Sequence, residues 1–499
     1  MRRGVLVSVT VLGVAAILTA GALLVYRGAL APQPVRPGTV PPGTYDPVVW
    51  GKIYPLEYDS WRQTADPRSA NKSKYKKGWD TDGVVYDKLS EFPYLALLSR
   101  GWGMGIEYNE PRGHYYMVTD QLEIDPSRVK PGGVCLTCKS PYAQKLLDEN
   151  GPAFLKMPYL EAVDKIPAAH RTLGVACIDC HDNQTMDLKV SRWTIRNALA
   201  ALGKTSPTRQ EMRSIVCGQC HCTYIITRDE EMKPTDVVFP WRGSRWGDIS
   251  VENIIREIQA SSSNLEWTQE VTGFKLGFIR HPEFEFYTRD SVHWQAGVAC
   301  ADCHMPYRRV GTSKISDHNV MSPLKDDMRA CLQCHTEKPD DLRRQVLAIQ
   351  DRTVALMNRA GYAAATVAKL FELAHREQAK GKVFDQKLYD QAKECYLQAF
   401  YRVVFLAAEN SVGFHNPSEA GRIAGDALAF AGRAEGLLRQ TLTAAGVQVP
   451  EVVNLELGKY LNDRGTKKLN FRPEQEIKDP TGLQDVFLPP AAKGLAVKK

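Results

Sequence analysis

The chain opens with a long apolar segment. After Met1-Arg2-Arg3, residues 4–25 contain no charge, and this run of 22 residues is long enough to span a bilayer. The two arginines before it favour a cytoplasmic N-terminus with the body outside. Small residues at Ala20-Gly21-Ala22 also fit a signal cleavage site. Residues 1–30 are therefore predicted to be a membrane anchor or a signal segment, with the anchor slightly preferred because Leu23-Leu24-Val25 prolongs the run.

The next two regions differ in their patterning. Residues 31–48 contain six prolines and are predicted to be an extended linker. Residues 49–339 show only weak periodicity, which indicates loops and short helices, and no long run there is typical of a β-strand. The linker is expected to tether the apolar segment to this region.

Beyond Asp340 the pattern changes to long helical runs. Gly381 and the segment 413–417 separate three of them. The predicted helices cover residues 340–379, 385–411 and 417–445. Apolar stripes such as Val346, Ile349 and Val354 are expected in the core or in a dimer interface. The fold class is thus mainly α, with a loop-rich body at 49–339 and long antiparallel helices in 340–499 packed on it.

Five copies of one motif lie in the loop-rich region. They are Cys135-Leu-Thr-Cys138-Lys139, Cys177-Ile-Asp-Cys180-His181, Cys217-Gly-Gln-Cys220-His221, Cys300-Ala-Asp-Cys303-His304 and Cys331-Leu-Gln-Cys334-His335. Two such cysteines bond the vinyl groups of one porphyrin, and the next residue then lies beneath the iron. A zinc site or a disulfide does not need a histidine at that position. We therefore predict five covalently attached haem c groups, whose faces supply much of the core.

The first motif ends in lysine instead of histidine. A haem iron with both axial positions filled passes electrons, whereas reaction at the metal requires an open position. The amine of Lys139 must bind unprotonated, although its ordinary pKa is about 10.4, so burial and the iron have to favour its neutral form. This difference marks one haem as chemically distinct and indicates an enzyme.

The chain has eleven histidines, and four of them follow the motifs. If the four histidine-ended haems are six-coordinate relays, four of the remaining seven histidines are distal ligands. Spacing alone does not choose among them, although His375 lies in a charged helical stretch and is expected to be solvated. The candidates are His114, His170, His281, His293, His318, His375 and His415.

Charge and the remaining cysteines add two constraints. Lys and Arg total 64 against 57 acids, a formal charge of +7, which about ten haem propionates would largely offset. We therefore expect no nucleic-acid partner.

Of twelve cysteines, ten belong to the motifs. Cys222 and Cys395 are expected to be buried thiols, and a disulfide between them is not favoured.

These features together resemble cytochrome c nitrite reductase, a family of exported pentahaem enzymes that reduce nitrite to ammonium. The resemblance extends from Tyr54-Pro-Leu-Glu-Tyr-Asp-Ser-Trp61 to the C-terminal helices, and the lysine of the first motif is its most specific mark. It implies nitrite as substrate. An anchored body implies a quinol-oxidising membrane cytochrome as electron donor, and a homodimer through the C-terminal helices is also expected. The body is then expected on the periplasmic side of the inner membrane.

The resemblance also assigns distal ligands. His114, in Pro-Arg-Gly-His, matches the ligand of the third haem, and His318, in Asp-His, that of the second. His415, in Gly-Phe-His-Asn-Pro, matches the ligand of the fourth haem, and His293 that of the fifth. His170 and His375 are left without a role.

Three further residues match the catalytic groups of the family. His281, in His-Pro-Glu-Phe-Glu, matches the catalytic histidine, and Tyr224 the catalytic tyrosine. Arg128 is the best match to the catalytic arginine, in a stretch of variable length. Nitrite oxygens would accept hydrogen bonds from Arg128 and His281. His281 and Tyr224 would carry protons for a reaction that consumes six electrons and eight protons.

The sequence departs from the family at its calcium site. Most members have a glutamate before the catalytic tyrosine and Lys-x-Gln before the catalytic histidine, whereas this chain has Thr223, Phe278 and Arg280. Calcium takes six to eight oxygen ligands, and the site has lost a carboxylate and an amide. We therefore predict that no calcium binds and that the Arg280 guanidinium takes its place.

Two alternatives stay open at this point. An electron-transfer multihaem cytochrome without a substrate would have all five irons six-coordinate. A related multihaem enzyme acting on hydroxylamine or sulfite would share the motifs.

Overall fold

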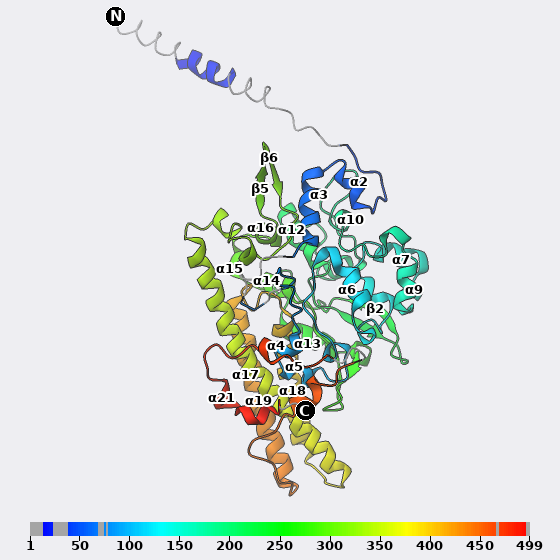
Figure 1. Ribbon diagram of the computed structural model, residues 1–499, viewed down its shortest axis with the longest axis vertical. Coiled ribbons are helices and arrows are strands. Elements are labelled where there is room, and N and C mark those ends of the chain that lie inside the picture. Colours follow the sequence, from blue (N-terminus) through cyan, green and yellow to red (C-terminus); the bar gives the residue numbers. More distant parts are fainter. Residues whose placement is uncertain (1–12, 23–37, 68–73, 76–77, 466–468, 496–499) are drawn as a thin grey trace, which may run out of the picture.

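The computed structural model describes residues 13–22, 38–67, 74–75, 78–465 and 469–495. Residues 13–22 form an exposed helical segment that lies well away from the body (Figure 1). The rest of the predicted anchor, residues 1–12 and 23–30, and the first part of the linker lie outside the described residues. Within the part of the chain that is described, no helix is both long and apolar enough to cross a membrane.

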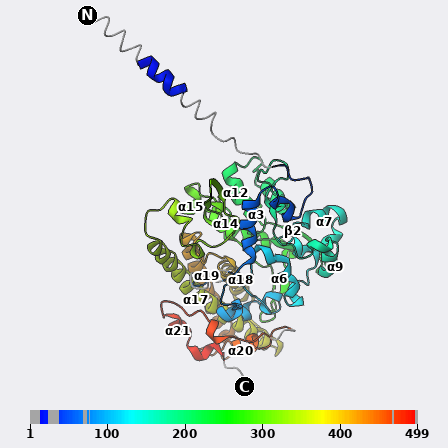
Figure 2. The same cartoon turned by 45° about the horizontal axis from the view of Figure 1, so that its top comes forward.

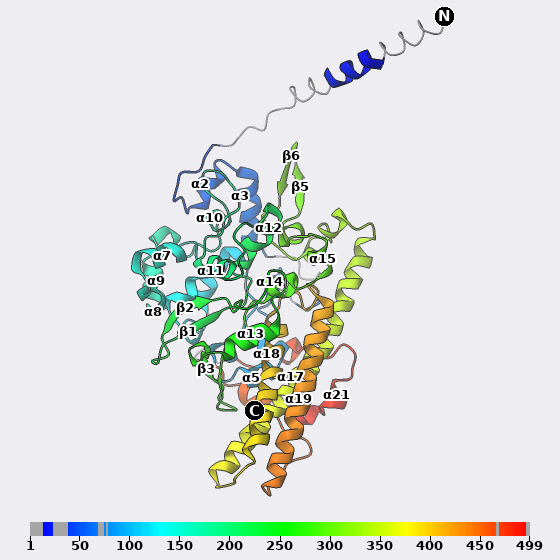
Figure 3. The ribbon, with the colours of Figure 1, turned by 180° about the vertical axis from the view of Figure 1, so that it is seen from behind.

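Short helices joined by loops make up the body. The helices are α2 (Pro47–Gly51), α3 (Pro55–Arg62), α4 (Lys88–Glu91), α5 (Tyr94–Leu98), α6 (Met117–Glu123), α7 (Ala143–Asn150), α8 (Ala153–Lys156), α9 (Tyr159–Asp164), α10 (Cys177–Cys180), α11 (Trp193–Ala201), α12 (Arg209–Gly218), α13 (Val251–Gln259), α14 (Glu283–Thr288), α15 (Val292–Gln295) and α16 (Cys300–His304). They cluster around the interior in all three views (Figures 1, 2 and 3). The body is mainly helical and rich in loops, as the weak periodicity indicated.

Three short hairpins accompany these helices. Each is antiparallel and has two strands. The pairs are β1 (Ile225–Arg228) with β2 (Pro234–Val238), β3 (Trp267–Thr268) with β4 (Lys275–Leu276), and β5 (Tyr307–Val310) with β6 (Ser313–Ser316). Because none exceeds five residues, the hairpins shape loops and form no sheet layer.

Three long helices form the other part of the molecule. They are α17 (Pro339–Ala379), α18 (Gln386–Ala408) and α19 (Pro417–Ala444), close to the predicted ranges. The side chain of Asp385 accepts from Leu388 N at the start of α18, and Asn416 caps α19 in the same way at Glu419 N. Proline at the first position of α17 and of α19 suits a helix start, where no backbone donor is needed.

Small side chains let these long helices pack closely. Helix α19 lies along both α17 and α18 (Figure 3), and its inward face consists mainly of alanines that are fully buried. They are Ala420, Ala424, Ala427, Ala431 and Ala434. Larger side chains such as Phe371 and Tyr396 fill the space between α17 and α18 and are also fully buried. The helices and the body share one continuous hydrophobic core.

Two contacts fix the long helices to the body. At Gly361 in α17, an added Cβ would lie 2.3 Å from the ring of Tyr94 in α5, so only glycine permits this approach. At the start of α19, Asn416 Nδ2 donates to the carbonyl oxygens of Phe286 and Arg289 beside α14. The segment between α18 and α19 therefore lies against the haem-motif region. The tail helices α20 (Leu457–Leu461) and α21 (Gln484–Phe487) pack on α5 and α17, respectively.

Candidate haem and active site

All five cysteine motifs lie on tight helical turns. In the second and fourth motifs, the residue before the last cysteine is an aspartate that caps its own turn. Asp179 accepts from Ala176 N at 2.9 Å, and Asp302 from Ala299 N at 2.8 Å. At the equivalent position of the third motif, Gln219 accepts from Ser191 N and Arg192 N. The two aspartates stabilise the turns that carry their cysteines, and Gln219 joins the third motif to the start of α11.

Four histidine pairs face one another across the motif region. Each pair joins the histidine of a motif to a histidine that the sequence matched as its distal partner. The ring centres are 6.1 Å apart for His181 and His318, 6.3 Å for His114 and His221, 6.1 Å for His304 and His415, and 6.3 Å for His293 and His335. The structure thus brings all eight residues together in the predicted combinations.

This spacing fits an iron between the two rings. Two imidazoles bound to one metal place their ring centres about 6 Å apart, because each metal–nitrogen bond is about 2 Å and each ring centre lies roughly 1 Å further. The side chain of His221 is 46% exposed although protein surrounds it, which leaves room for a planar group beside the ring. The residues therefore fit haem at the four paired sites.

The paired rings are oriented by two kinds of acceptor. His181 and His304 have Nδ1 about 3 Å from the carbonyl oxygens of Met186 and Met321, and His318 faces Ser316 O at 2.9 Å. His415 instead faces a carboxylate, with Nδ1 2.7 Å from Glu409 Oε1. Such acceptors fix the tautomer and leave Nε2 for the metal.

Lys139 follows the first motif in the same region. Its side chain is half-buried, and burial lowers the pKa of Lys139. A lowered pKa favours the neutral amine that a metal requires. Four of the seven non-motif histidines are used in the pairs, while His170 and His375 bond to Tyr142 and Tyr389. His281 is the remaining one, and it interacts electrostatically with Lys139.

Arg128 lies near the same amine. It ends the 3₁₀ turn Pro126–Arg128, where the side chain of Asp125 caps the turn by accepting from Ser127 N. Its Nη1 donates to the carbonyl oxygen of Glu107, and its guanidinium lies 5.8 Å from the ring of Tyr108. The guanidinium also interacts electrostatically with Lys139 and Tyr224. Arg128, Tyr224 and Lys139 therefore share one region of the structure.

Tyr224 precedes β1 and lies between the first motif and Arg280. Burial raises the pKa of Tyr224, and the positive charge of Arg280 opposes that rise only in part. The phenol therefore stays protonated at neutral pH. The guanidinium of Arg280 lies 4.8 Å from the centre of the tyrosine ring, so a fixed cation supports the ring of Tyr224.

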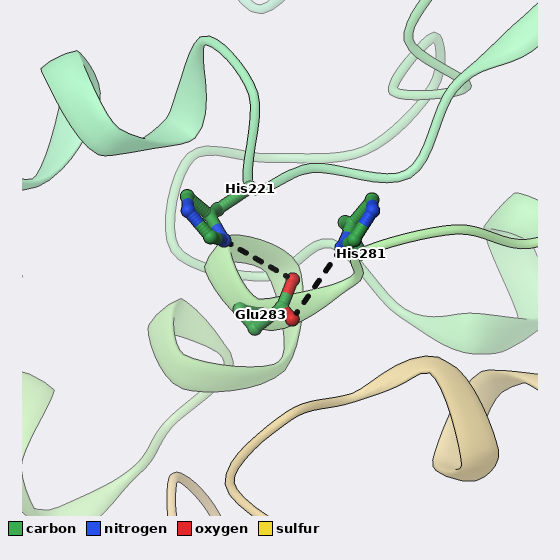
Figure 4. A group of neighbouring side chains, drawn as sticks. All are labelled: His221, His281 and Glu283. Atoms are coloured by element: carbon green, nitrogen blue, oxygen red, sulfur yellow. Dashed lines mark ion pairs between the residues drawn. The ribbon is translucent and has the colours of Figure 1, made fainter. Parts of the chain in front are cut away.

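His281 is held in an unusual backbone conformation. Its φ is +48°, a left-handed value that costs a non-glycine residue about 1–2 kcal/mol. Its ring faces the carboxylate of Glu283, with Nδ1 3.8 Å from Oε1, and His221 Nδ1 lies 3.8 Å from Oε2 (Figure 4). Burial lowers the pKa of His281, an effect that Glu283 opposes.

Arg280 forms a buried ion pair behind Tyr224. Its Nη1 lies 2.8 Å from Glu266 Oε1 and its Nη2 2.6 Å from Glu266 Oε2. Nη1 also donates to the carbonyl oxygens of Tyr224 at 3.3 Å and of Phe278 at 3.4 Å. Arg280 is 3% exposed and Glu266 4%. The guanidinium therefore occupies a position ringed by acceptor oxygens.

Sequence reasoning missed the carboxylates that support these residues. Glu266, Glu283 and Glu409 lie on loops or at helix ends and belong to no periodic pattern. A buried arginine requires a buried anion, which implied a partner for Arg280 but did not identify Glu266. His375, expected in solvent, is half buried because its ring packs against Phe274 and bonds to Tyr389.

Cys222 and Cys395 are both buried and form no disulfide. This agrees with the expectation of two separate thiols.

The arrangement matches a known family. The cytochrome c552 family model matches residues 46–486, which is most of the chain. The chain belongs to the cytochrome c552 family. This membership confirms the resemblance drawn from the motifs and identifies the chain as a c-type cytochrome.

Relatives in this family carry related names. The cytochrome c nitrite reductase subunit NrfA of Nitratidesulfovibrio vulgaris is 36% identical over 353 residues, which are 66% of this chain and 65% of that protein. Cytochrome c-552 of Desulfotalea psychrophila is 31% identical over 444 residues, which are 84% and 80% of the two chains.

A solved structure of a family member has the same fold. It is cytochrome c nitrite reductase from Desulfovibrio desulfuricans, described as having two calcium sites in its catalytic subunit NrfA. It superposes with a TM-score of 0.71 and 27% identity over 86% of this chain and 96% of that one. The mainly α fold with loop-rich body and long helices is therefore that of this family.

Proposed function

We propose that this protein reduces nitrite to ammonium at a haem ligated by Lys139, supplied with electrons by four bis-histidine haems. The observation that carries the proposal is the difference between the motifs. Four motif histidines face a second histidine at 6.1–6.3 Å. The first motif ends instead in the half-buried Lys139, which interacts electrostatically with Arg128 and His281. The names of the relatives support nitrite as the substrate.

The proposed haem ligands divide into covalent and axial groups. Cys135 and Cys138, Cys177 and Cys180, Cys217 and Cys220, Cys300 and Cys303, and Cys331 and Cys334 would hold the five haems, with Lys139, His181, His221, His304 and His335 on the proximal side and His318, His114, His415 and His293 on the distal side of the second to fifth. When bound, the haems would pass six electrons from the donor to nitrite one at a time, and the haem held by Lys139 would offer nitrite a coordination position.

Each pocket side chain has a distinct task. Arg128 stays cationic in proteins, and its free N–H groups bind the oxygens of nitrite and favour cleavage of the N–O bonds. Tyr224 presents a protonated hydroxyl, because burial raises its pKa. His281 keeps Nδ1 toward Glu283, so Nε2 is the nitrogen that can pass protons to the pocket.

A direct assay tests this function. The purified holoprotein, reduced by a viologen dye, should convert nitrite to ammonium in equal molar amount, and its mass after acid denaturation should exceed the polypeptide by five haems. A mass with four haems would contradict the haem at Lys139. Nitrite consumption without ammonium would contradict the proposed reaction.

The same preparation separates the alternatives. One high-spin ferric haem among five is expected here, whereas an electron-transfer protein would have none. Turnover of nitrite should also exceed that of hydroxylamine and of sulfite. Faster turnover of either of those would assign the pocket to the related multihaem enzymes.

Arg280 replaces calcium in the proposed site. Calcium prefers anionic oxygen ligands, and the buried carboxylate of Glu266 is already engaged by both terminal nitrogens of Arg280. The backbone oxygens of Tyr224 and Phe278 accept from the same guanidinium. A permanent cation thus meets the acceptors that a calcium ion would need, and it fixes Tyr224 from behind.

A homodimer through the long helices is part of the proposal. Helix α19 carries a stripe of small residues on its outward face, and an added Cβ on any of its four glycines would meet nothing within 4 Å. The stripe consists of Gly421, Gly425, Ala429, Gly432 and Gly436. Such residues let two helices approach closely. Light scattering should give the mass of two chains, and Gly425→Trp should convert the protein to monomers.

The proposed location is the periplasmic side of the inner membrane, with a quinol-oxidising membrane cytochrome as electron donor. The uncharged run at residues 4–25 and the exported haem chemistry support it. Holoprotein that sediments with membranes and begins at Met1 would establish the anchor. A soluble form that begins near residue 23 would establish a cleaved signal.

A further inference from the structure

Glu283 lies between two histidines that belong to different sites. It begins α14, immediately after His281 and Pro282. The backbone of the same helix is joined to the third motif, because Phe284 N donates to His221 O at 2.9 Å. On the other side, Arg280 N donates to Thr223 Oγ1 at 3.0 Å. These two bonds hold the segment 280–284 against the motif that contains His221.

The carboxylate of Glu283 faces both imidazoles at once. Oε1 lies 3.8 Å from His281 Nδ1, and Oε2 lies 3.8 Å from His221 Nδ1 (Figure 4). Asn410, just after α18, donates its Nδ2 to Oε1. Oε2 and His281 Nδ1 have no hydrogen-bond partner among the described residues, and both are buried. A shift of about 1 Å would bring each imidazole into hydrogen-bond distance.

Burial makes this arrangement strongly dependent on its partners. The side chain of Glu283 is 9% exposed, and burial alone would raise the pKa of its carboxyl. Each carboxylate oxygen lies 3.8 Å from one imidazole nitrogen, so the two histidines are the groups that can offset the cost of burying this charge. The Glu283 carboxylate therefore depends on both imidazoles.

We propose that Glu283 is a positioning residue that holds the proximal imidazole of the third haem and the catalytic imidazole of the first haem at the same time. The inference rests on the proposed function for the role of His281. For His221 it rests only on the haem motif and on the pairing with His114.

Two consequences follow from a shared carboxylate. An acceptor at Nδ1 makes a metal-bound imidazole a stronger donor and stabilises the oxidised iron, so Glu283 lowers the reduction potential of the third haem. The same acceptor fixes the ring of His281 with Nε2 toward the pocket. Electron supply and proton supply at the first haem therefore depend on one side chain.

The test is Glu283→Gln in the full holoprotein. The amide keeps the size of the side chain and removes its charge. All five haems should be retained, the midpoint potential of the third haem should rise in a spectroscopic redox titration, and nitrite turnover should fall about 10- to 100-fold. Glu283→Asp, which restores the carboxylate on a shorter stem, should recover part of both effects.

Glu285→Gln is the matched control. Glu285 lies two residues further on α14 and is equally buried, and it accepts from Trp241 Nε1 at 2.8 Å and from Thr223 N at 3.0 Å. It touches neither imidazole, so the potential of the third haem should stay at the wild-type value.

Several results would overturn the inference. If Glu283→Gln leaves the potential of the third haem unchanged, Glu283 does not position His221. If nitrite turnover in that variant equals the wild-type value, Glu283 does not position His281. Metal analysis could give a third result that contradicts the inference, because two histidines and a carboxylate also suit a divalent metal. A stoichiometric metal beyond the five irons would assign Glu283 as a ligand instead. If the potential rises in a protein that reduces no nitrite, the contact with His221 stands and the proposed function fails.

Discussion

The Lys139 pocket and the four histidine pairs are built from the same motif but are completed differently. At each pair, a second imidazole from a distant segment occupies the far side, 6.1–6.3 Å from the first. Around Lys139, the chain instead places Arg128, Tyr224 and His281, whose side chains can donate hydrogen bonds. Under the proposed function, one motif serves two purposes, and the residues contributed by the rest of the chain decide between them.

The groups that face the imidazoles differ less sharply. His181, His304 and His318 face neutral backbone carbonyls, whereas the paired His415 and His221 face the carboxylates of Glu409 and Glu283. Around the pocket, charged side chains are buried and paired, with Arg280 on Glu266 and Glu283 beside His281. Buried charges are costly unless paired, and such cost is expected where a site must handle an anion and protons. The comparison yields four predictions.

The largest effect is expected from removing the buried cation of the pocket. Arg280→Ala leaves Glu266 buried without its main partner and should lower the free energy of unfolding of the holoprotein by about 3–5 kcal/mol. Chemical denaturation followed by haem absorbance measures it. Lys145→Ala, which breaks the exposed pair with Glu149 on α7, should cost less than about 1 kcal/mol. An equal loss of unfolding free energy in both variants would mean that the buried Arg280–Glu266 pair stabilises the protein no more than an exposed pair does.

Removing either proton carrier should come next. His281→Ala and Tyr224→Phe should each reduce nitrite turnover about 100-fold or more, because general acid groups contribute about that factor. Haem content and the low-spin spectra of the four pairs should not change. His375→Ala is the control, since His375 lies on α17 and bonds to Tyr389. Unchanged turnover in both variants would show that the pocket is elsewhere.

Removing the distal histidine of one pair should leave that haem with one protein ligand, as proposed for the haem at Lys139. In His415→Ala the fourth haem loses its distal imidazole, so ferric protein should contain two high-spin haems in five instead of one. Electron paramagnetic resonance measures the ratio. The opened site lacks Arg128, Tyr224 and His281. It should therefore reduce no nitrite in a double variant that also carries Lys139→Ala. A spectrum identical to that of the wild type would show that His415 is not a haem ligand.

The smallest effect is expected from calcium removal. Chelator treatment should change nitrite turnover by less than about twofold, because a guanidinium meets the carbonyl oxygens of Tyr224 and Phe278. Elemental analysis of protein purified with calcium present should find no stoichiometric calcium. Activity lost to chelator and restored by calcium would contradict the replacement by Arg280.

The long helices could be predicted closely from sequence, and one difference is informative. The second was expected to reach residue 411 but ends at Ala408. Glu409 leaves helical geometry because its carboxylate accepts from Ser411 N, Gly413 N and His415 Nδ1. The polar loop that positions His415 thus overrides helix propensity, and no local pattern announces such a loop.

The site could be predicted in part. The motif cysteines and their axial ligands are local patterns, and the family resemblance supplied the distal histidines and catalytic residues. The supporting carboxylates were not found, because Glu266 and Glu283 lie outside the motifs and meet Arg280 and His221 only through the folding of the intervening loops. Contacts of this kind depend on how loops pack, and periodicity carries no information about them.

The histidine pairs have a consequence for the unfolded chain. Their members are 107, 137, 111 and 42 residues apart in sequence. An iron that binds both members closes a loop, as a disulfide does, and a cross-link that closes a loop of about 100 residues can stabilise a fold by about 4–5 kcal/mol through lost chain entropy. The proposed haems would therefore cross-link the loop-rich body, whose helices are short. A chain that failed to acquire them should stay unfolded in that half while its long helices remain helical.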